Sequence, residues 1–176
     1  MNKKILILMI GLFYSCGSIK TYNLGDNQKI TDAKIIEGNY EVFPLNTEKR
    51  NYNSVYAILN TFNNENSKYT EEINSFEIKI INDKYLNFIF KKDNSEIKIS
   101  KKYFLNKNGF LKINNKSKIS GIPYLIGGIQ IKKIELGVTK NKELIINGSE
   151  SDESAILFIP VSSPKESFIY KFKKIE

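Results

Sequence analysis

Residues 76–90 read FEIKIINDKYLNFIF, and this stretch decides the fold that the sequence predicts. From Phe76 to Ile80, apolar residues alternate with charged ones. Successive side chains of a β-strand point to opposite faces, so this alternation indicates a strand with one buried face. The Asn82-Asp83 pair is a turn signal, and residues 85–90 follow as a second apolar strand. The stretch therefore predicts an antiparallel hairpin.

The same alternation continues from about residue 35 to the end of the chain. Residues 103–105 and 110–113 flank Asn108-Gly109, a pair suited to the positive φ angles of a tight hairpin turn. Ile129 and Ile131 are out of phase with the apolar residues at 134, 136 and 138, which predicts a β-bulge near Lys132 and Lys133. About nine short strands result, which indicates an antiparallel sandwich or barrel.

One segment departs from the strand pattern. Tyr52, Val55, Tyr56 and Leu59 have the i, i+3, i+4, i+7 spacing of an amphipathic helix. A strand through Val55, Ala57 and Leu59 is the alternative reading. The spacing favours one short helix near the N-terminal side of the domain.

The composition excludes much familiar catalytic chemistry. The 176 residues include no His, no Trp and one Cys, so His-based triads, the commonest zinc sites and an intramolecular disulfide are ruled out. The neighbouring acid pairs Glu71-Glu72 and Asp152-Glu153 would point to opposite faces of a strand, and no nucleophile with a plausible base is apparent. We therefore expect a non-catalytic protein with neither a cofactor nor a metal site.

The N-terminus has the form of a secretory signal. Lys3 and Lys4 precede an apolar run over residues 5–14, which has the length of a signal h-region and is shorter than the ~20 residues of a membrane-spanning helix. Ser15 then precedes Cys16, the only cysteine, and this ending resembles a bacterial lipoprotein lipobox. The resemblance implies that Cys16 is lipidated, that residues 1–15 are removed, and that the acyl chains attach the protein to a membrane. Phe13 and Tyr14 depart from the usual pattern before the cysteine.

The resemblance also implies a location. Surface-exported lipoproteins of Bacteroidetes-type bacteria tend to carry acidic residues just after the cysteine, whereas here no acid precedes Asp26. We therefore expect a periplasm-facing outer-membrane lipoprotein, with surface exposure as the alternative. The expected organisation is a signal peptide at 1–15, a lipidated cysteine with a flexible polar tether at 16–34, and a β-barrel domain at 35–176.

Gly38-Asn39-Tyr40, followed by a short helix and a run of antiparallel strands, resembles the lipocalin-like lipoproteins of the same bacteria. The classical lipocalin motif has Trp where this chain has Tyr40. The resemblance implies an all-β, antiparallel lipocalin-like barrel of about 8–10 strands. It transfers a fold more safely than a ligand.

Lysines are concentrated in one part of the chain. Residues 91–118 contain nine lysines against Asp93 and Glu96. Lys98, Lys101 and Lys102 are candidates for a face that binds an anionic partner. The alternative is a solvated face that protects a sheet edge. With Arg50 as the only arginine, nucleic acid is not the expected partner.

Two further features bear on function. Residues 121–128 form the most apolar predicted loop, either a crossover that caps one barrel end or a mobile lip over a ligand mouth. The 10 Tyr and 11 Phe are enough to line a cavity as well as a core. We expect a lipid-anchored barrel that binds a small apolar or amphiphilic ligand. The alternative is an envelope interaction module that uses its lysine-rich face on a partner protein.

Overall fold

The computed structural model describes residues 26–47, 54–60, 73–92, 95–113, 117–122, 126–156, 159–162 and 166–175. Its described strands are all antiparallel, and one short α-helix and one 3-10 turn accompany them. The strands in chain order are β1 Asn27–Gln28, β2 Gly38–Glu41, β3 Ser75–Asn82, β4 Tyr85–Lys92, β5 Ser95–Leu105, β6 Leu111–Ile113, β7 Ser117–Ile122, β8 Ile126–Thr139, β9 Leu144–Ile156, β10 Ile159–Ser162, β11 Glu166–Phe172 and β12 Lys174–Ile175. The helical segments are η2 Ala33–Ile36 and α2 Val55–Asn60.

The strands form a curled sheet that returns to its starting strand. Each strand from β2 to β6 pairs with the next, β6 pairs with β8, and β8 pairs with β9. β11 pairs with β9 and continues into β12, which pairs with β2. This up-and-down ladder confirms the predicted all-β, lipocalin-like antiparallel barrel.

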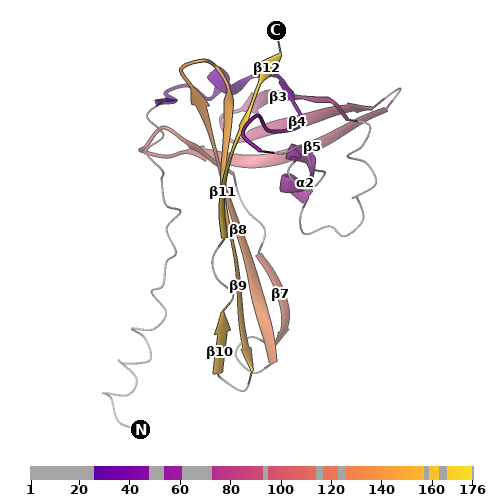
Figure 1. Cartoon of the computed structure of the whole chain (residues 1–176), viewed down its shortest axis with the longest axis vertical. Helices are drawn as coiled ribbons and strands as arrows, with labels where there is room; N and C mark the ends of the chain where they lie inside the picture. The colour runs from indigo at the N-terminus through magenta and orange to yellow at the C-terminus, as the bar shows by residue number, and fades with distance from the viewer. Residues whose placement is uncertain are drawn as a thin grey trace.

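The barrel has two walls. The pairing of β5 changes along its length, because residues up to Lys102 pair with β4 and residues from Tyr103 pair with β6. In Figure 1, β3, β4 and β5 run across the direction of β8, β9 and β11. A strand that changes partners in this way forms a corner between two sheets.

The core follows from the period-two pattern that predicted the strands. Phe76 and Ile78 on β3 are buried, as are Leu86, Phe88 and Phe90 on β4. In the other wall, Leu136 and Val138 on β8 and Leu144 and Ile146 on β9 occupy the same interior. Each such side chain contributes roughly 1.5–3 kcal/mol through burial, so the two walls hold each other in place.

Most of the local predictions are confirmed. The helix predicted around residues 52–59 is α2, and the 3-10 turn η2 was not predicted. The hairpin around Asn108-Gly109 is present, although within this pair only Gly109 has a positive φ, of 80°. Its turn is closed by Asn106, whose Oδ1 accepts hydrogen bonds from the backbone N–H groups of Asn108 and Phe110.

The predicted bulge near Lys132 and Lys133 is wrong. β8 and β9 pair without a shift from Val138↔Leu144 to Ile126↔Ile156. The apolar residues of β8 change from one face of the strand to the other because β8 runs past the end of the barrel. Beyond that point, the barrel core no longer requires the apolar residues to be on one particular face.

The fold also begins earlier than residue 35. Ile30 is buried, β1 pairs with the end of β8, and Asp32 caps η2 by accepting a hydrogen bond from Lys34 N at 2.9 Å. Residues 26–34, predicted as part of the tether, thus belong to the folded unit. Residues 1–25, including Cys16, lie outside the described residues.

Candidate functional site

Aromatic side chains converge at the centre of the barrel. The ring centroid of Phe76 lies 5.7 Å from that of Tyr40, 5.6 Å from Phe90, 6.1 Å from Phe88 and 6.3 Å from Phe172. These rings come from β2, β4 and β11 as well as β3, so they meet from both walls. At this level the interior is occupied by side chains rather than by space for a ligand.

Short helical segments cover the core on two sides. On α2, Tyr56 lies edge-on to Phe90 at 5.2 Å, and Val55 N–H donates to Val42 O at 3.1 Å. On η2, Ile36 is buried and its carbonyl accepts a hydrogen bond from the Tyr40 hydroxyl at 2.9 Å. Burial raises the pKa of Tyr40 to about 12. Tyr40 is therefore a core residue.

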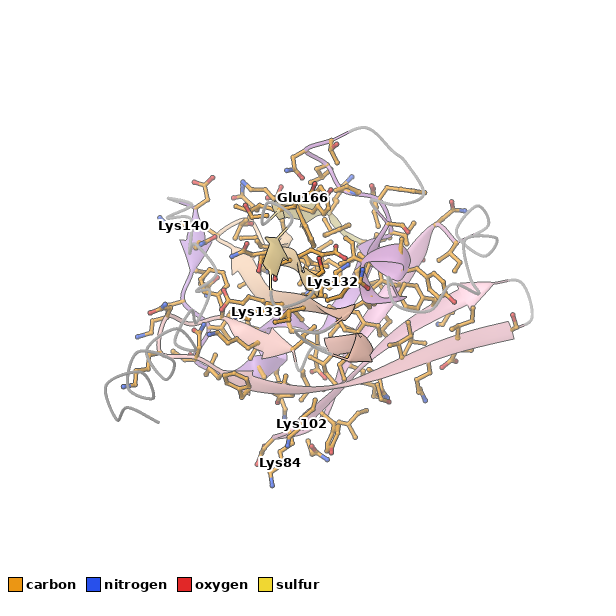
Figure 2. All side chains as sticks on the ribbon, turned by 90° about the horizontal axis from the view of Figure 1, so that it is seen from below. Lys84, Lys102, Lys132, Lys133, Lys140 and Glu166 are labelled. Atoms are coloured by element: carbon orange, nitrogen blue, oxygen red, sulfur yellow. The ribbon has the colours of Figure 1, made fainter. Side chains whose placement is uncertain are left out.

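Charged side chains line the inner face where the barrel ends. Lys132 is only 5% exposed and lies directly opposite Glu150, with Nζ 3.9 Å from Oε2 and 5.7 Å from the centre of the Phe168 ring. Figure 2 views the molecule along this end and shows Lys132 near its middle. Burial lowers the pKa of Lys132, Glu150 opposes this effect, and Lys101 adds to it.

The three predicted lysines do not share one face. On β5, Lys101 lies opposite the buried Leu86, and its Nζ donates to Leu59 O at 3.4 Å. Lys98 and Lys102 are exposed and occupy the alternate, outer positions of the strand. The structure therefore keeps Lys98 and Lys102 on a common surface and turns Lys101 toward the interior.

A cluster of lysine and aromatic residues lies on the outer face near Lys102. We define the outer patch as Lys84, Tyr85, Lys102, Phe104 and Lys112. Tyr85 pairs with Lys102 across β4 and β5, while Phe104 pairs with Lys112 across β5 and β6. Tyr85 and Phe104 are 45% and 54% exposed, large values for aromatic residues.

Two contacts fix the outer patch to the fold. Lys112 Nζ lies 6.0 Å from the centre of the Phe104 ring and 3.4 Å from Oε1 of the buried Glu135. The Lys84 carbonyl accepts a hydrogen bond from Tyr103 N, and Figure 2 shows Lys84 and Lys102 together at one edge of the molecule. In the described part of the chain, the side-chain ion pairs are Lys112–Glu135, Lys132–Glu150 and Lys171–Asp26, so they include neither Lys84 nor Lys102. The i, i+2 spacing of Lys102 and Phe104 was the sequence signal for this cluster.

Beyond the barrel, four strands continue as an arm. We define the arm as β7, β10, residues 126–131 of β8 and residues 151–156 of β9. Figure 1 shows it extending away from the barrel. Among described strands, β7 pairs only with β8, and β10 pairs only with β9. Residues 121–128, predicted to be a loop at the barrel mouth, instead contribute to β7 and β8, and their residues 123–125 lie outside the described ones.

The arm combines open edges with few charges, since its charged residues are Lys118, Asp152 and Glu153. No Asp, Glu, Lys or Arg occurs between Lys118 and Lys132 or between Glu153 and Lys165. The pairing register places four isoleucines in one row at the far end of the arm: Ile122, Ile126, Ile156 and Ile159. Apolar residues in adjacent paired positions form a row on one face of a sheet, and such a face is normally covered by a second layer.

Within the described residues, no helix has the length and apolar character needed to cross a membrane. The same residues contain no group of three or more His, Cys, Asp or Glu side chains that would hold a metal ion. No protein-family model, curated protein or solved structure matches the chain significantly.

Proposed function

We propose that this chain is a membrane-anchored, non-catalytic lipoprotein whose β-barrel serves as an interaction module of the cell envelope. The observation that carries the choice of a module over a ligand carrier is the aromatic packing around Phe76. A barrel filled at this level offers its outer surfaces, rather than its interior, to other molecules.

The anchor in this proposal rests on the sequence. An apolar run followed by Ser15-Cys16 has the order of a lipoprotein signal, and two or three acyl chains give lasting attachment because each buried CH₂ contributes roughly 0.8 kcal/mol. The absence of acidic residues between Cys16 and Asp26 supports a periplasm-facing outer-membrane location.

The arm is the surface that we propose for a partner protein. Its outer strands have unpaired edges among the described residues, and an added strand would use those backbone groups. Its row of isoleucines would supply apolar contact area. One face of an antiparallel sheet is normally packed against another layer of the protein. In the arm, a partner protein would provide that layer.

A second candidate function is the binding of an amphiphilic ligand at the end of the barrel. Lys132 favours it, because this buried ammonium lies 5.7 Å from the centre of the Phe168 ring and would suit the carboxylate of a fatty acid. The ligand's chain would have to enter beside α2, since the centre is occupied by Phe76 and its neighbours.

One set of measurements tests the anchor. The wild-type chain should fractionate with membranes and carry the added mass of acyl groups on Cys16. Cys16→Ala should be released and unmodified. Membrane fractionation and mass that are the same in both chains would contradict the lipoprotein proposal.

A second set separates the module from the ligand carrier. Native mass spectrometry of the protein extracted from membranes should show the acylated chain without a stoichiometric small molecule. A photo-crosslinking residue at Ser154 on the arm should give a discrete protein adduct in cells, whereas one at Lys142, at the opposite end of the β8–β9 hairpin, should not. A bound amphiphile lost in Lys132→Met would instead support the second candidate.

A further inference from the structure

The outer patch has the composition of a membrane-contact surface. It brings two exposed aromatic rings, Tyr85 and Phe104, together with three lysines. Aromatic side chains favour the headgroup region of a bilayer, where the ring is partly desolvated, while lysine ammonium groups bind lipid phosphates. Neither type of residue alone would carry this argument, because scattered surface lysines are common.

The register shows that these residues form a continuous surface. Tyr85 faces Lys102 across one strand pair, Lys102 and Phe104 are on the same side of β5, and Phe104 faces Lys112 across the next pair. On the neighbouring β3, Ile81 is 50% exposed and precedes Asn82, which pairs with Tyr85. Two acidic residues lie next to the patch, Asp83 beside Lys84 in the chain and the buried Glu135 3.4 Å from Lys112, so the three lysines outnumber them.

The length of the N-terminal segment places a membrane within reach of the outer patch. Ten residue steps separate Cys16 from Asp26, so this segment spans at most about 35 Å. Asn27 pairs with Thr139, and Lys112 pairs with Glu135, four positions further along β8. At about 3.4 Å per residue, the patch begins only about 14 Å along the strand from the point where the segment leaves the fold.

The arm is less suited to the same membrane. Its far end at Ile126 is thirteen positions from Thr139 along β8, or about 44 Å. If the arm stood perpendicular to the membrane with its far end at the surface, Asp26 would lie about 44 Å above that surface. The segment from Cys16 to Asp26 spans at most about 35 Å, so it could not reach the membrane. Deeper insertion would place in hydrocarbon the edges of β7 and β10 that have no partner among the described strands, and backbone groups need partners there.

We infer that the outer patch is a second membrane attachment, in which Lys84, Lys102 and Lys112 bind anionic phospholipid headgroups while Tyr85 and Phe104 enter the interface. This inference rests on the proposed lipid anchor at Cys16. In this inference, the partner of the outer patch is an anionic bilayer, and the arm remains the proposed surface for a partner protein.

The absence of Trp from the chain gives a direct test. Phe104→Trp places the only tryptophan of that variant in the outer patch, where it can be excited selectively. Leu45→Trp places one at a comparably exposed position, 48%, where residue 45 contacts β11 rather than β5. Each full-length, lipid-modified variant is reconstituted into phosphatidylglycerol-containing vesicles whose lipid chains carry bromine. We expect quenching at position 104 to exceed that at position 45 at least threefold.

Charge variants identify the headgroup contact. Lys84→Glu with Lys102→Glu should reduce quenching at position 104 to the level at position 45, and so should high salt or phosphatidylcholine vesicles. Lys142→Glu with Lys173→Glu makes the same change in net charge at exposed sites elsewhere and should leave the quenching unchanged. Lys112 is retained because it is the counter-ion of buried Glu135. Circular dichroism checks that each variant is folded. If the Lys84→Glu, Lys102→Glu variant unfolds, Lys84→Gln with Lys102→Gln replaces it.

Vesicle flotation separates the two proposals. A wild-type chain without acyl mass that fails to float would overturn the anchor. A chain that floats but shows equal quenching at positions 104 and 45 would overturn the outer patch alone. Strong quenching that is insensitive to both lysines and to salt would also overturn it, since the contact would then not involve anionic headgroups.

Discussion

Lys132 and Glu150 lie directly opposite each other across β8 and β9, with 3.9 Å between Nζ and Oε2, at the level where the barrel gives way to the arm. On the barrel side, the next inward position of β8 is the buried Ile134. On the arm side, the next pair on the same face is Gln130 and Asp152. This pair therefore marks the end of the apolar core.

Replacing Lys132 with Met should raise the free energy of unfolding by about 1 kcal/mol at pH 7, because the ammonium is desolvated in the fold. Because the pKa of Lys132 is lowered in the folded state, the folded wild type loses the Lys132 proton at a lower pH than the unfolded chain does. The penalty thus disappears as the pH rises from the lowered pKa toward 10.5, and the advantage of Lys132→Met should shrink. Urea unfolding at pH 7 and pH 10 measures this. Lys133→Met, at the alternate strand position, is the control, and a less stable Lys132→Met at pH 7 would contradict the expectation.

Lys142 is the only described residue other than glycine with a positive φ, of 65°. Its turn, closed by Lys142 N–H donating to Thr139 O, matches the turn in which Gly109 N–H donates to Asn106 O. We expect Lys142→Gly to stabilise the protein by roughly 0.5–1 kcal/mol, because a left-handed residue with a Cβ is strained. The reciprocal Gly109→Ala should be destabilising, since its Cβ would also meet Lys29. Thermal unfolding of both variants is the measurement, and a lower Tm for Lys142→Gly would refute this reading.

Tyr40 should make the protein sensitive to alkali. Its pKa is about 12 in the fold against 10.0 in an unfolded chain, so between these values the unfolded state ionises first and stability falls by up to about 1.4 kcal/mol per pH unit. Tyr40→Phe removes the hydrogen bond to Ile36 O, so its free energy of unfolding at pH 7 should be about 1 kcal/mol lower than that of the wild type. Above pH 10, however, its free energy of unfolding should decline less steeply than that of the wild type. Parallel alkaline profiles for the two proteins would argue against this assignment.

Phe168 covers Gly148 on the neighbouring strand, and a Cβ at position 148 would collide with the Phe168 ring. Gly148→Ala should therefore cost about 1–3 kcal/mol. In a double-mutant cycle with Phe168→Ala, the combined loss should be smaller than the sum of the single losses, because the second change removes the collision. Additive losses would show that the glycine has another role.

The sequence predicted what a single period-two pattern specifies. Phe76, Phe88 and their neighbours identified the buried face, and Gly109 identified a turn, because these features depend on residues close in the chain. The path of β8 beyond the barrel was not predictable. Ile129 and Ile131 alternate like any strand residues, although out of phase with Leu136, and no local signal in the sequence tells where the opposite wall ends.

The candidate surfaces depended still more on pairing between strands. The run of lysines was visible, but the split between Lys101 and Lys102 required the exact phase of β5. The outer patch additionally required the register that sets Tyr85 beside Lys102 and Phe104 beside Lys112. Such cross-strand relationships are set by the whole sheet rather than by any one segment.

The pairing of β12 with β2 has a consequence for export. Lys174 Nζ reaches the carbonyl of Glu37, 137 positions earlier, and Lys174 itself pairs with Tyr40. Contacts of such sequence separation are slow to form, and a chain that crosses a membrane from its N-terminus delivers these C-terminal residues last. In a chain exported as proposed, the barrel therefore could not close during translocation, and β2 and β3 would expose apolar faces until it did. Such an exported chain would depend on periplasmic chaperones until β12 pairs with β2. Removal of only the last few residues, which include β12, would leave the barrel open.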